Sequence, residues 1–440
     1  MAFERSKKDE REGRGLAVKK FGFMITLAFM GVFAVIISRN FAIYVPGIPK
    51  NYQVDHSRYL SDGSGIYVLT DHAQEDYSWV KEELCRGNAR EVEEKYKDRL
   101  SEMTEGEEYI TVQNILGIAE VYLGDYIQAD HYFNEAIEAV EKENLPNRKE
   151  ILSVLYNNAG AVTVDLPEQD AGEERLERAM GLREDPYLKL VIGANQICRI
   201  NEDDSDRKIG RTIARGKRLA KREKQFGGDI YFVQLLSDIY VSFGFSLTGQ
   251  TERAIKTVEE SVIQIPDRME YNMVKAALLG QKGYYHVAQG EYEKGEEDYL
   301  EAVGLMEQTV DEHSRRLALE YYRLASNYSY REEWDRAWNC LERAIPGFRQ
   351  ATPYSKGNVS QGLGIICQEL NKEEEAKRYY LKAYLHQKEA ARRVGLPYVE
   401  ASLENSLYEI YDSETNRTIP FHEWIEQGMD EMGINEDDWP

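Results

Sequence analysis

Histidine and cysteine are the side chains that most often bind metals or act as nucleophiles, and this 440-residue chain has seven and four of them. The histidines are His56, His72, His131, His286, His313, His386 and His422. They show no H-E-x-x-H pattern or similar spacing that would bring two ligands together. The cysteines are Cys85, Cys198, Cys340 and Cys367. They show no C-x-x-C spacing, so we expect no metal and no cofactor.

Two acidic stretches resemble metal sites only superficially. Residues 71–76, DHAQED, have no regular ligand spacing, which favours a solvated loop. Residues 201–206, NEDDSD, lack the glycine and the terminal glutamate of a calcium loop. The chain also has no glycine-rich phosphate loop and no G-x-S-x-G turn. Because catalysis needs convergent groups of this kind, we predict that the protein is not an enzyme.

A basic stretch interrupts an acidic chain. Residues 207–224, RKIGRTIARGKRLAKREK, contain nine cations and one acid. Four of the cations fall near one face of a helix: Arg211, Arg215, Arg218 and Arg222. One interpretation is that this face pairs with acidic neighbours in the same protein. The other is a docking surface for an acidic protein segment, an anionic lipid or an anionic polymer.

Net charge argues against nucleic acid as a partner. The chain carries −23, and residues 1–20 hold seven Lys or Arg against four Asp or Glu, so the remaining residues carry −26. A body this acidic would be repelled by phosphate backbones.

An apolar segment follows the basic N-terminus. Residues 21–37, FGFMITLAFMGVFAVII, contain no charge, and FAIYV at 41–45 extends the apolar character. About 20 apolar residues cross a bilayer core, so 21–45 predicts a transmembrane signal anchor. A cleaved signal peptide, giving a secreted protein, is the second choice, but no A-x-A-like cleavage site is visible. The cations at 7–20 place the N-terminus inside and the body outside the cytoplasmic membrane.

A spacing pattern recurs through the rest of the chain. In 324–344, LASNYSYREEWDRAWNCLERA, alanines stand at 325, 337 and 344, with Leu324, Tyr328 and Leu341 between them. Similar patterns begin near 116, 159, 249, 283 and 363, at displacements of 39–43 residues, and 187–224 fits one degenerate copy. Small residues at fixed positions let two helices approach closely while large residues fill the space beside them. Repeats of this length predict stacked helix hairpins with one shared core.

The pattern resembles the tetratricopeptide repeat (TPR), although the period is longer than the usual 34 residues. The resemblance implies an all-α, right-handed α-solenoid of antiparallel helix hairpins, following the transmembrane helix. We expect a cytoplasmic tail at 1–20, the anchor at 21–45, a linker and N-terminal capping helices at 46–105, the solenoid at 106–411 and an acidic tail at 412–440.

The resemblance also implies a concave groove lined by the first helix of each hairpin. Carried onto this chain, its binding positions include Ile118, Tyr122, Phe243, Tyr284, Tyr322 and Tyr330. Such a groove would be aromatic, aliphatic and nearly neutral, and would suit a helix face or an extended peptide. Only Asn158 and Arg323 match the clamp that some family members use for a terminal carboxylate. The alternative is that long helices simply bury these residues as core.

We therefore expect a membrane-anchored, extracytoplasmic adaptor or scaffold that binds a protein or peptide partner in the groove. A chaperone-like binder of unfolded or secreted clients would use the same groove, and a peptide sensor or an enzyme is less favoured. Cys340 and Cys367 fall on adjacent predicted helices, so they are either free buried thiols or a cross-link between repeats.

Overall fold

The computed structural model describes residues 52–70, 77–163, 169–182, 185–200, 204–227, 232–349, 351–393, 409–412, 417–420, 428 and 432–434. Residues 54–440 form one compact unit, separate from residues 1–53. The predicted anchor at 21–45 lies outside the described residues, and no helix within them is long and apolar enough to cross a membrane.

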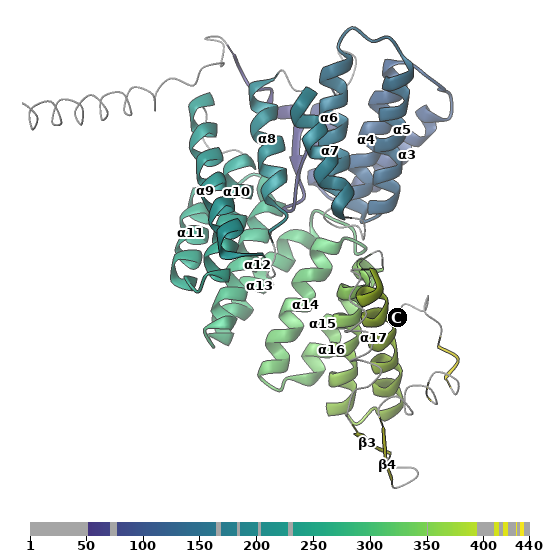
Figure 1. Ribbon diagram of the computed structural model, residues 1–440, viewed down its shortest axis with the longest axis vertical. Helices are drawn as coiled ribbons and strands as arrows, with labels where there is room; N and C mark the ends of the chain where they lie inside the picture. The colour runs from purple at the N-terminus through teal and green to yellow at the C-terminus, as the bar shows by residue number, and fades with distance from the viewer. Residues whose placement is uncertain are drawn as a thin grey trace, which may run out of the picture. The chain divides into compact units, whose positions relative to one another are not determined.

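The described part of the chain contains sixteen α-helices in a TPR-like array (Figure 1). Two capping helices, α2 (Tyr77–Cys85) and α3 (Ala89–Leu100), precede seven hairpins. The first helices of the hairpins are α4 (Glu107–Leu123), α6 (Arg148–Val162), α8 (Pro186–Ile197), α10 (Phe232–Leu247), α12 (Asn272–Ala288), α14 (Arg315–Tyr330) and α16 (Pro353–Glu369). The second helices are α5 (Tyr126–Lys142), α7 (Gln169–Leu182), α9 (Asp206–Glu223), α11 (Thr251–Gln264), α13 (Tyr292–Glu307), α15 (Trp334–Ala344) and α17 (Glu373–Arg393).

The repeat spacing is confirmed by burial within one hairpin. Ala325, Ala337 and Ala344 are at most 1 % exposed, and Leu324, Tyr328 and Leu341 are at most 3 % exposed. The small residues therefore lie where α14 and α15 pack, as the spacing predicts. The degenerate copy at 187–224 is also a hairpin, formed by α8 and α9.

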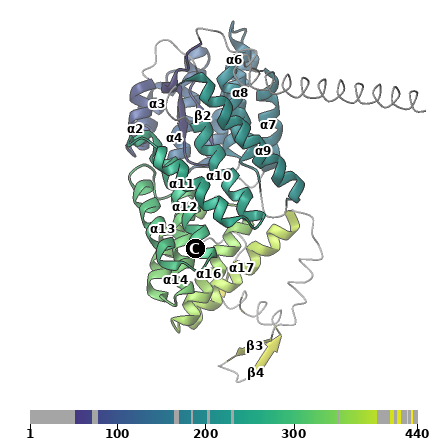
Figure 2. The same cartoon turned by 90° about the vertical axis from the view of Figure 1, so that its left-hand side faces the viewer.

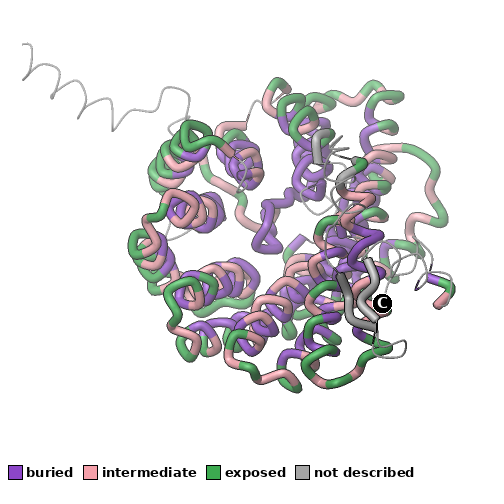
Figure 3. Tube along the Cα trace, turned by 60° about the horizontal axis from the view of Figure 1, so that its bottom comes forward, coloured by how far each residue is buried: buried purple, intermediate pink, exposed green. Residues whose placement is uncertain are grey.

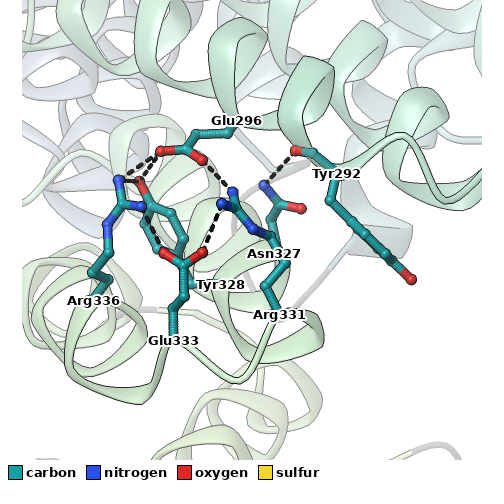
Figure 4. Close-up of polar contacts among 7 residues, drawn as sticks. All are labelled: Tyr292, Glu296, Asn327, Tyr328, Arg331, Glu333 and Arg336. Carbon is teal, nitrogen blue, oxygen red and sulfur yellow. Dashed lines mark hydrogen bonds and ion pairs between the residues drawn. The ribbon is translucent and has the colours of Figure 1, made fainter.

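A polar cluster joins the α14–α15 hairpin to the preceding hairpin, α12–α13 (Figure 4). Glu296 on α13 accepts hydrogen bonds from Tyr328 at 3.0 Å, from Arg336 at 2.5 Å and from Arg331. The Arg336 guanidinium also lies 3.9 Å from the centre of the Tyr328 ring. Asn327 donates to the backbone oxygen of Tyr292 at 3.0 Å. These contacts join successive repeats through groups that the sequence pattern alone does not reveal.

The first helices of the first two hairpins, α4 and α6, are buried on every side along most of their length. All residues from Ile110 to Tyr122 of α4 and from Ile151 to Val162 of α6 are buried. A helix that is apolar all round needs a cover on its inner face as well as its outer face. Figure 2 places β2 beside these helices.

The cover is a β-hairpin from the segment before the helices. Strands β1 (Tyr59–Ser61) and β2 (Ile66–Val68) pair antiparallel, and every residue from 59 to 70 is buried. Figure 3 shows this buried extended segment enclosed by the helices. The sequence interpretation of this stretch as a linker therefore differs from the structure. The remaining strands, β3 (Glu409–Asp412) and β4 (Arg417–Pro420), form a second antiparallel pair near the C-terminus.

The array bends far enough for early and late helices to touch. The backbone N–H of Asp311 donates to the oxygen of Tyr122 at 3.2 Å, and the N–H of Arg315 donates to the Tyr126 hydroxyl at 2.9 Å. A Cβ on Gly124 would lie 2.2 Å from the backbone oxygen of His313, so glycine permits this contact. The α4–α5 turn thus meets the α13–α14 loop, and the inner face encloses the hairpin.

Candidate peptide-binding site

Two asparagines, on the first helices of successive hairpins, each hydrogen-bond both backbone groups of one residue of β2. Asn158 on α6 donates to the oxygen of Val68 at 2.8 Å and accepts from its N–H at 2.9 Å. Asn195 on α8 donates to the oxygen of Ile66 at 2.8 Å and accepts from its N–H at 2.8 Å. Each side-chain amide therefore pairs with both the donor and the acceptor of one residue.

Two further asparagines complete the row. Asn114 on α4 donates to the oxygen of Val68 at 3.1 Å, and Asn157 on α6 donates to the oxygen of Ile66 at 3.0 Å. The amides also bond one another: Asn158 donates to Asn114 at 2.8 Å, and Asn195 donates to Asn157 at 2.9 Å. We call these four residues the asparagine row; all are at most 1 % exposed.

The register of the hairpin explains why the asparagine row is needed. Val68 lies opposite Tyr59, and Ile66 lies opposite Ser61. The N–H of Leu69 donates to the backbone oxygen of Arg58 at 2.8 Å. In an antiparallel pair, alternate residues bond the neighbouring strand, so the N–H and C=O groups of Ile66 and Val68 face away from β1. A buried peptide group without a partner costs about 1–3 kcal/mol. The asparagine row supplies the partners that a third strand would otherwise provide.

The turn of the hairpin is fitted to the helices at its tip. Asp62 accepts from the N–H groups of Ser64 and Gly65, both at 2.9 Å. Gly63 has a φ of +84°, and a Cβ there would lie 2.9 Å from both Ala277 and the oxygen of Met273 on α12. A side chain at 63 would therefore be strained by backbone conformation and by contact with α12.

Tyrosine hydroxyls from two other helices hold the same turn. Tyr122 on α4 donates to the oxygen of Ser61 at 3.3 Å, and Tyr240 on α10 donates to the oxygen of Ser64 at 3.4 Å. Burial raises the pKa of Tyr122 well above its usual value, so its hydroxyl stays protonated as a donor. The hairpin is thus recognised largely through its backbone, by neutral groups from several repeats.

The predicted groove residues do not share one open surface. Ile118 is fully buried and Tyr122 is 2 % exposed, whereas Phe243 and Tyr322 are half-buried. Tyr284 is 37 % and Tyr330 65 % exposed. The N-terminal half of the groove is therefore filled by the chain itself, and exposed aromatic positions remain on α12 and α14.

The predicted basic face is largely solvent-exposed. Arg211, Arg218 and Arg222 are exposed on α9, while Arg215 is half-buried and donates to Gln196. Burial, reinforced by the charge of Arg218, lowers the pKa of Arg215. The structure thus places three of the four arginines on the surface and turns the fourth inward.

The four cysteines are free and buried. Cys340 and Cys367 are therefore not cross-linked in the structure, and burial raises the pKa of each to about 11. Thiols with such pKa values react poorly as nucleophiles at neutral pH. Within the described residues, no group of three His, Cys, Asp or Glu could hold a metal ion.

The asparagine row is only partly visible in the sequence. The repeat pattern gives Asn114 as a groove position and Asn158 as a clamp match without connecting the two, and it does not single out Asn157 or Asn195. A usable signal exists, because Asn114 and Asn157 each stand three residues before the small residue of their repeat, Gly117 or Gly160. A polar side chain at one repeat position in apolar helices predicts a shared buried partner.

Comparisons with known proteins return similar folds but no family. No family model and no curated protein match the chain. Among solved structures, a Rap protein complexed with Competence and Sporulation Factor is 12 % identical, with 74 % of this chain and 93 % of that chain covered at a TM-score of 0.47. The quorum sensor NprR from B. thuringiensis is 13 % identical, with 76 % and 97 % covered at 0.39. TPR-like repeats of a putative kinesin light chain from Podosopora anserina are 13 % identical, with 48 % and 100 % covered at 0.37.

Proposed function

We propose that this protein is a membrane-anchored, extracytoplasmic TPR-like adaptor whose inner face binds an extended segment of a protein partner. Residues 59–70 occupy that site when no partner is present. The observation that supports this proposal is the asparagine row, which pairs with the backbone of Ile66 and Val68. Because these side-chain amides bond only backbone groups of this segment, the site can bind extended segments of many sequences.

Side-chain pockets add selectivity to this backbone recognition. Ile66, Tyr67, Val68 and Leu69 are at most 1 % exposed, so the inner face favours aliphatic and aromatic side chains on an extended segment. Exposed Tyr284 and Tyr330 on α12 and α14 offer contact area for the remainder of a partner, because tyrosine loses little entropy on binding. The partner would therefore carry an apolar extended motif.

Peptide binding in trans tests the proposal. The probe is a fluorescent peptide with the sequence of residues 57–70, added to the full chain in detergent. A variant with Ile66→Asp and Val68→Asp weakens docking of the internal hairpin, because it buries two carboxylates without partners. We expect this variant to bind the probe at least about tenfold more tightly than the unmodified chain, which is a gain of ~1.4 kcal/mol.

The matched controls separate recognition from non-specific capture. Adding Asn158→Ala and Asn195→Ala to the same variant should remove the gain, and a scrambled peptide should bind neither protein. Circular dichroism reports whether the helices remain folded. A folded variant that ignores the probe contradicts a peptide site on the inner face.

The membrane part of the proposal is tested separately. A reporter fused to either end of the full chain, combined with protease treatment of intact cells, should show a protected N-terminus and an accessible C-terminus. Release of the whole chain by alkaline carbonate would contradict the anchor and leave the peptide site unaffected.

A further inference from the structure

Helix α9 presents a continuous positive surface on an otherwise acidic protein. Its buried side is formed by Ile209, Gly216, Leu219 and Glu223. Its exposed side, together with the 3₁₀ turn η2 (Lys224–Phe226), carries eight cations. These are Arg207, Lys208, Arg211, Lys217, Arg218, Lys221, Arg222 and Lys224. We call this set the α9 basic face.

The α9 basic face is poorly neutralised by its surroundings. Of its eight cations, only Lys208 forms an ion pair with a described acidic residue, Asp204, at 2.6 Å. Lys217 lies 4.5 Å from the centre of the Phe245 ring, which is a cation–π contact and not a countercharge. Among the residues that the structure describes, the expected pairing with acidic neighbours is thus limited to Lys208 with Asp204 and to the electrostatic attraction between Lys224 and Asp238.

Several cations of the α9 basic face are close enough along the helix to repel one another. Arg207 and Arg211, Lys217 and Lys221, and Arg218 and Arg222 each stand four residues apart on one helix. Like charges at this spacing repel one another and destabilise a helix. An external anionic surface would offset this repulsion.

The predicted membrane anchor would keep the C-terminal end of α9 close to the bilayer. His56 packs against Tyr187 with ring centres 5.9 Å apart, and Tyr187 packs against Phe226 of η2 at 5.4 Å. The predicted anchor ends at residue 45, eleven residues before His56. Eleven extended residues reach at most ~40 Å, so an anchored chain cannot move this end of α9 far from the bilayer.

We propose that the α9 basic face binds anionic lipid headgroups of the membrane in which the chain is anchored. The geometry of this inference depends on the anchor in the proposed function, but not on the peptide site. The cations spread over 18 residues of helix, or about 27 Å, which suits many headgroups better than one compact ligand. Cations near an anionic bilayer are attracted to it, whereas the acidic remainder of the chain is repelled.

Lipid cross-linking tests this surface on the full chain. The chain is placed in nanodiscs of zwitterionic lipid, or of zwitterionic lipid with about one-third phosphatidylglycerol, each with a trace of photoactivatable lipid. Mass spectrometry then measures the lipid adducts on peptides from residues 206–224. We expect anionic lipid to raise the adduct yield at least about fivefold, and 0.5 M salt to remove most of the increase.

A charge-matched control isolates the α9 basic face. Arg211→Gln, Arg218→Gln and Arg222→Gln together should abolish the increase. Lys142→Gln, Arg178→Gln and Lys256→Gln remove three exposed cations from α5, α7 and α11 and should leave it intact. Equal yields in the two lipids, or equal losses in the two variants, would overturn the proposal.

A flotation assay keeps this inference separate from the anchor. If the chain fails to insert, the same variants are mixed with preformed vesicles of the two compositions. Loss of anionic-vesicle binding in the α9 variant alone supports the lipid surface even when the anchor is wrong. No preference for anionic vesicles in that assay overturns the lipid surface.

Discussion

Asn158 is the residue on which the inner face depends most directly. Its amide satisfies both the N–H and the oxygen of Val68 and also bonds Asn114. Asn158→Ala should lower the free energy of unfolding by about 2 kcal/mol, because buried peptide groups lose their partner. Asn158→Asp should cost more, since a carboxylate cannot donate to the Val68 oxygen. Urea unfolding measures both, with exposed Asn339→Ala as the control; equal midpoints for all variants would contradict this role.

Glu223 predicts a pH dependence of stability. Its carboxylate is 1 % exposed and accepts from the Tyr187 hydroxyl at 2.6 Å and from the N–H groups of Val233 and Gln234. Burial raises its pKa to about 8, although these hydrogen bonds oppose the shift.

The sign follows from proton binding. Between pH 4.5, the unperturbed pKa, and about 8 the folded chain holds a proton that the unfolded chain has released. The contribution of Glu223 to stability should therefore fall as pH rises through this window. Glu223→Gln should flatten the change measured by urea unfolding at pH 5, 6.5 and 8. Parallel pH profiles for the two proteins would exclude Glu223 as the source.

At the scale of elements, the turn between the two helices of a hairpin usually has glycine at its left-handed residue, but two turns do not. The turn residue has a positive φ in five repeats: Gly124, Gly249, Gly290, Glu332 and Asn371. The left-handed conformation costs a residue other than glycine about 1–2 kcal/mol, and asparagine tolerates it best. Glu332 is thus the most strained of the five.

Replacing that residue tests the turn directly. Glu332→Gly should raise the thermal midpoint, with a net gain of about 0.5–1 kcal/mol after the flexibility of glycine is allowed for. Gly290→Ala should lower the midpoint for the opposite reason. A lower midpoint for Glu332→Gly would mean that its side chain has a stabilising role that its exposed position does not suggest.

The helix hairpins could be predicted from sequence, and the β-hairpin could not. Small residues recurring every 39–43 positions predicted the α14–α15 packing and even the degenerate α8–α9 pair. Residues 59–70 gave no comparable signal, because both faces of β2 are buried and the polar-apolar alternation of a half-exposed strand is missing. Its turn, SDGSG at 61–65, has the small and polar residues of a linker.

At the scale of the whole molecule, the β-hairpin links several repeats of the array through the inner face. The hairpin contacts five helices: Tyr122 of α4, Asn158 of α6, Asn195 of α8 and Tyr240 of α10 bond its backbone, and its Gly63 packs against α12. Repeat arrays gain stability from neighbouring units, so an occupant spanning five of them also couples those units. Exchange of this occupant for a partner would therefore alter the stability of the whole array.

We propose that residues 59–70 occupy the inner face as a replaceable ligand and not as permanent core. Hydrogen exchange followed by mass spectrometry on the full chain tests it most directly. We expect the amides of Ile66 and Val68 to exchange through a local opening, at least about 100-fold faster than those of α6. Exchange of both regions only through global unfolding would contradict the claim and make the hairpin a fixed part of the fold.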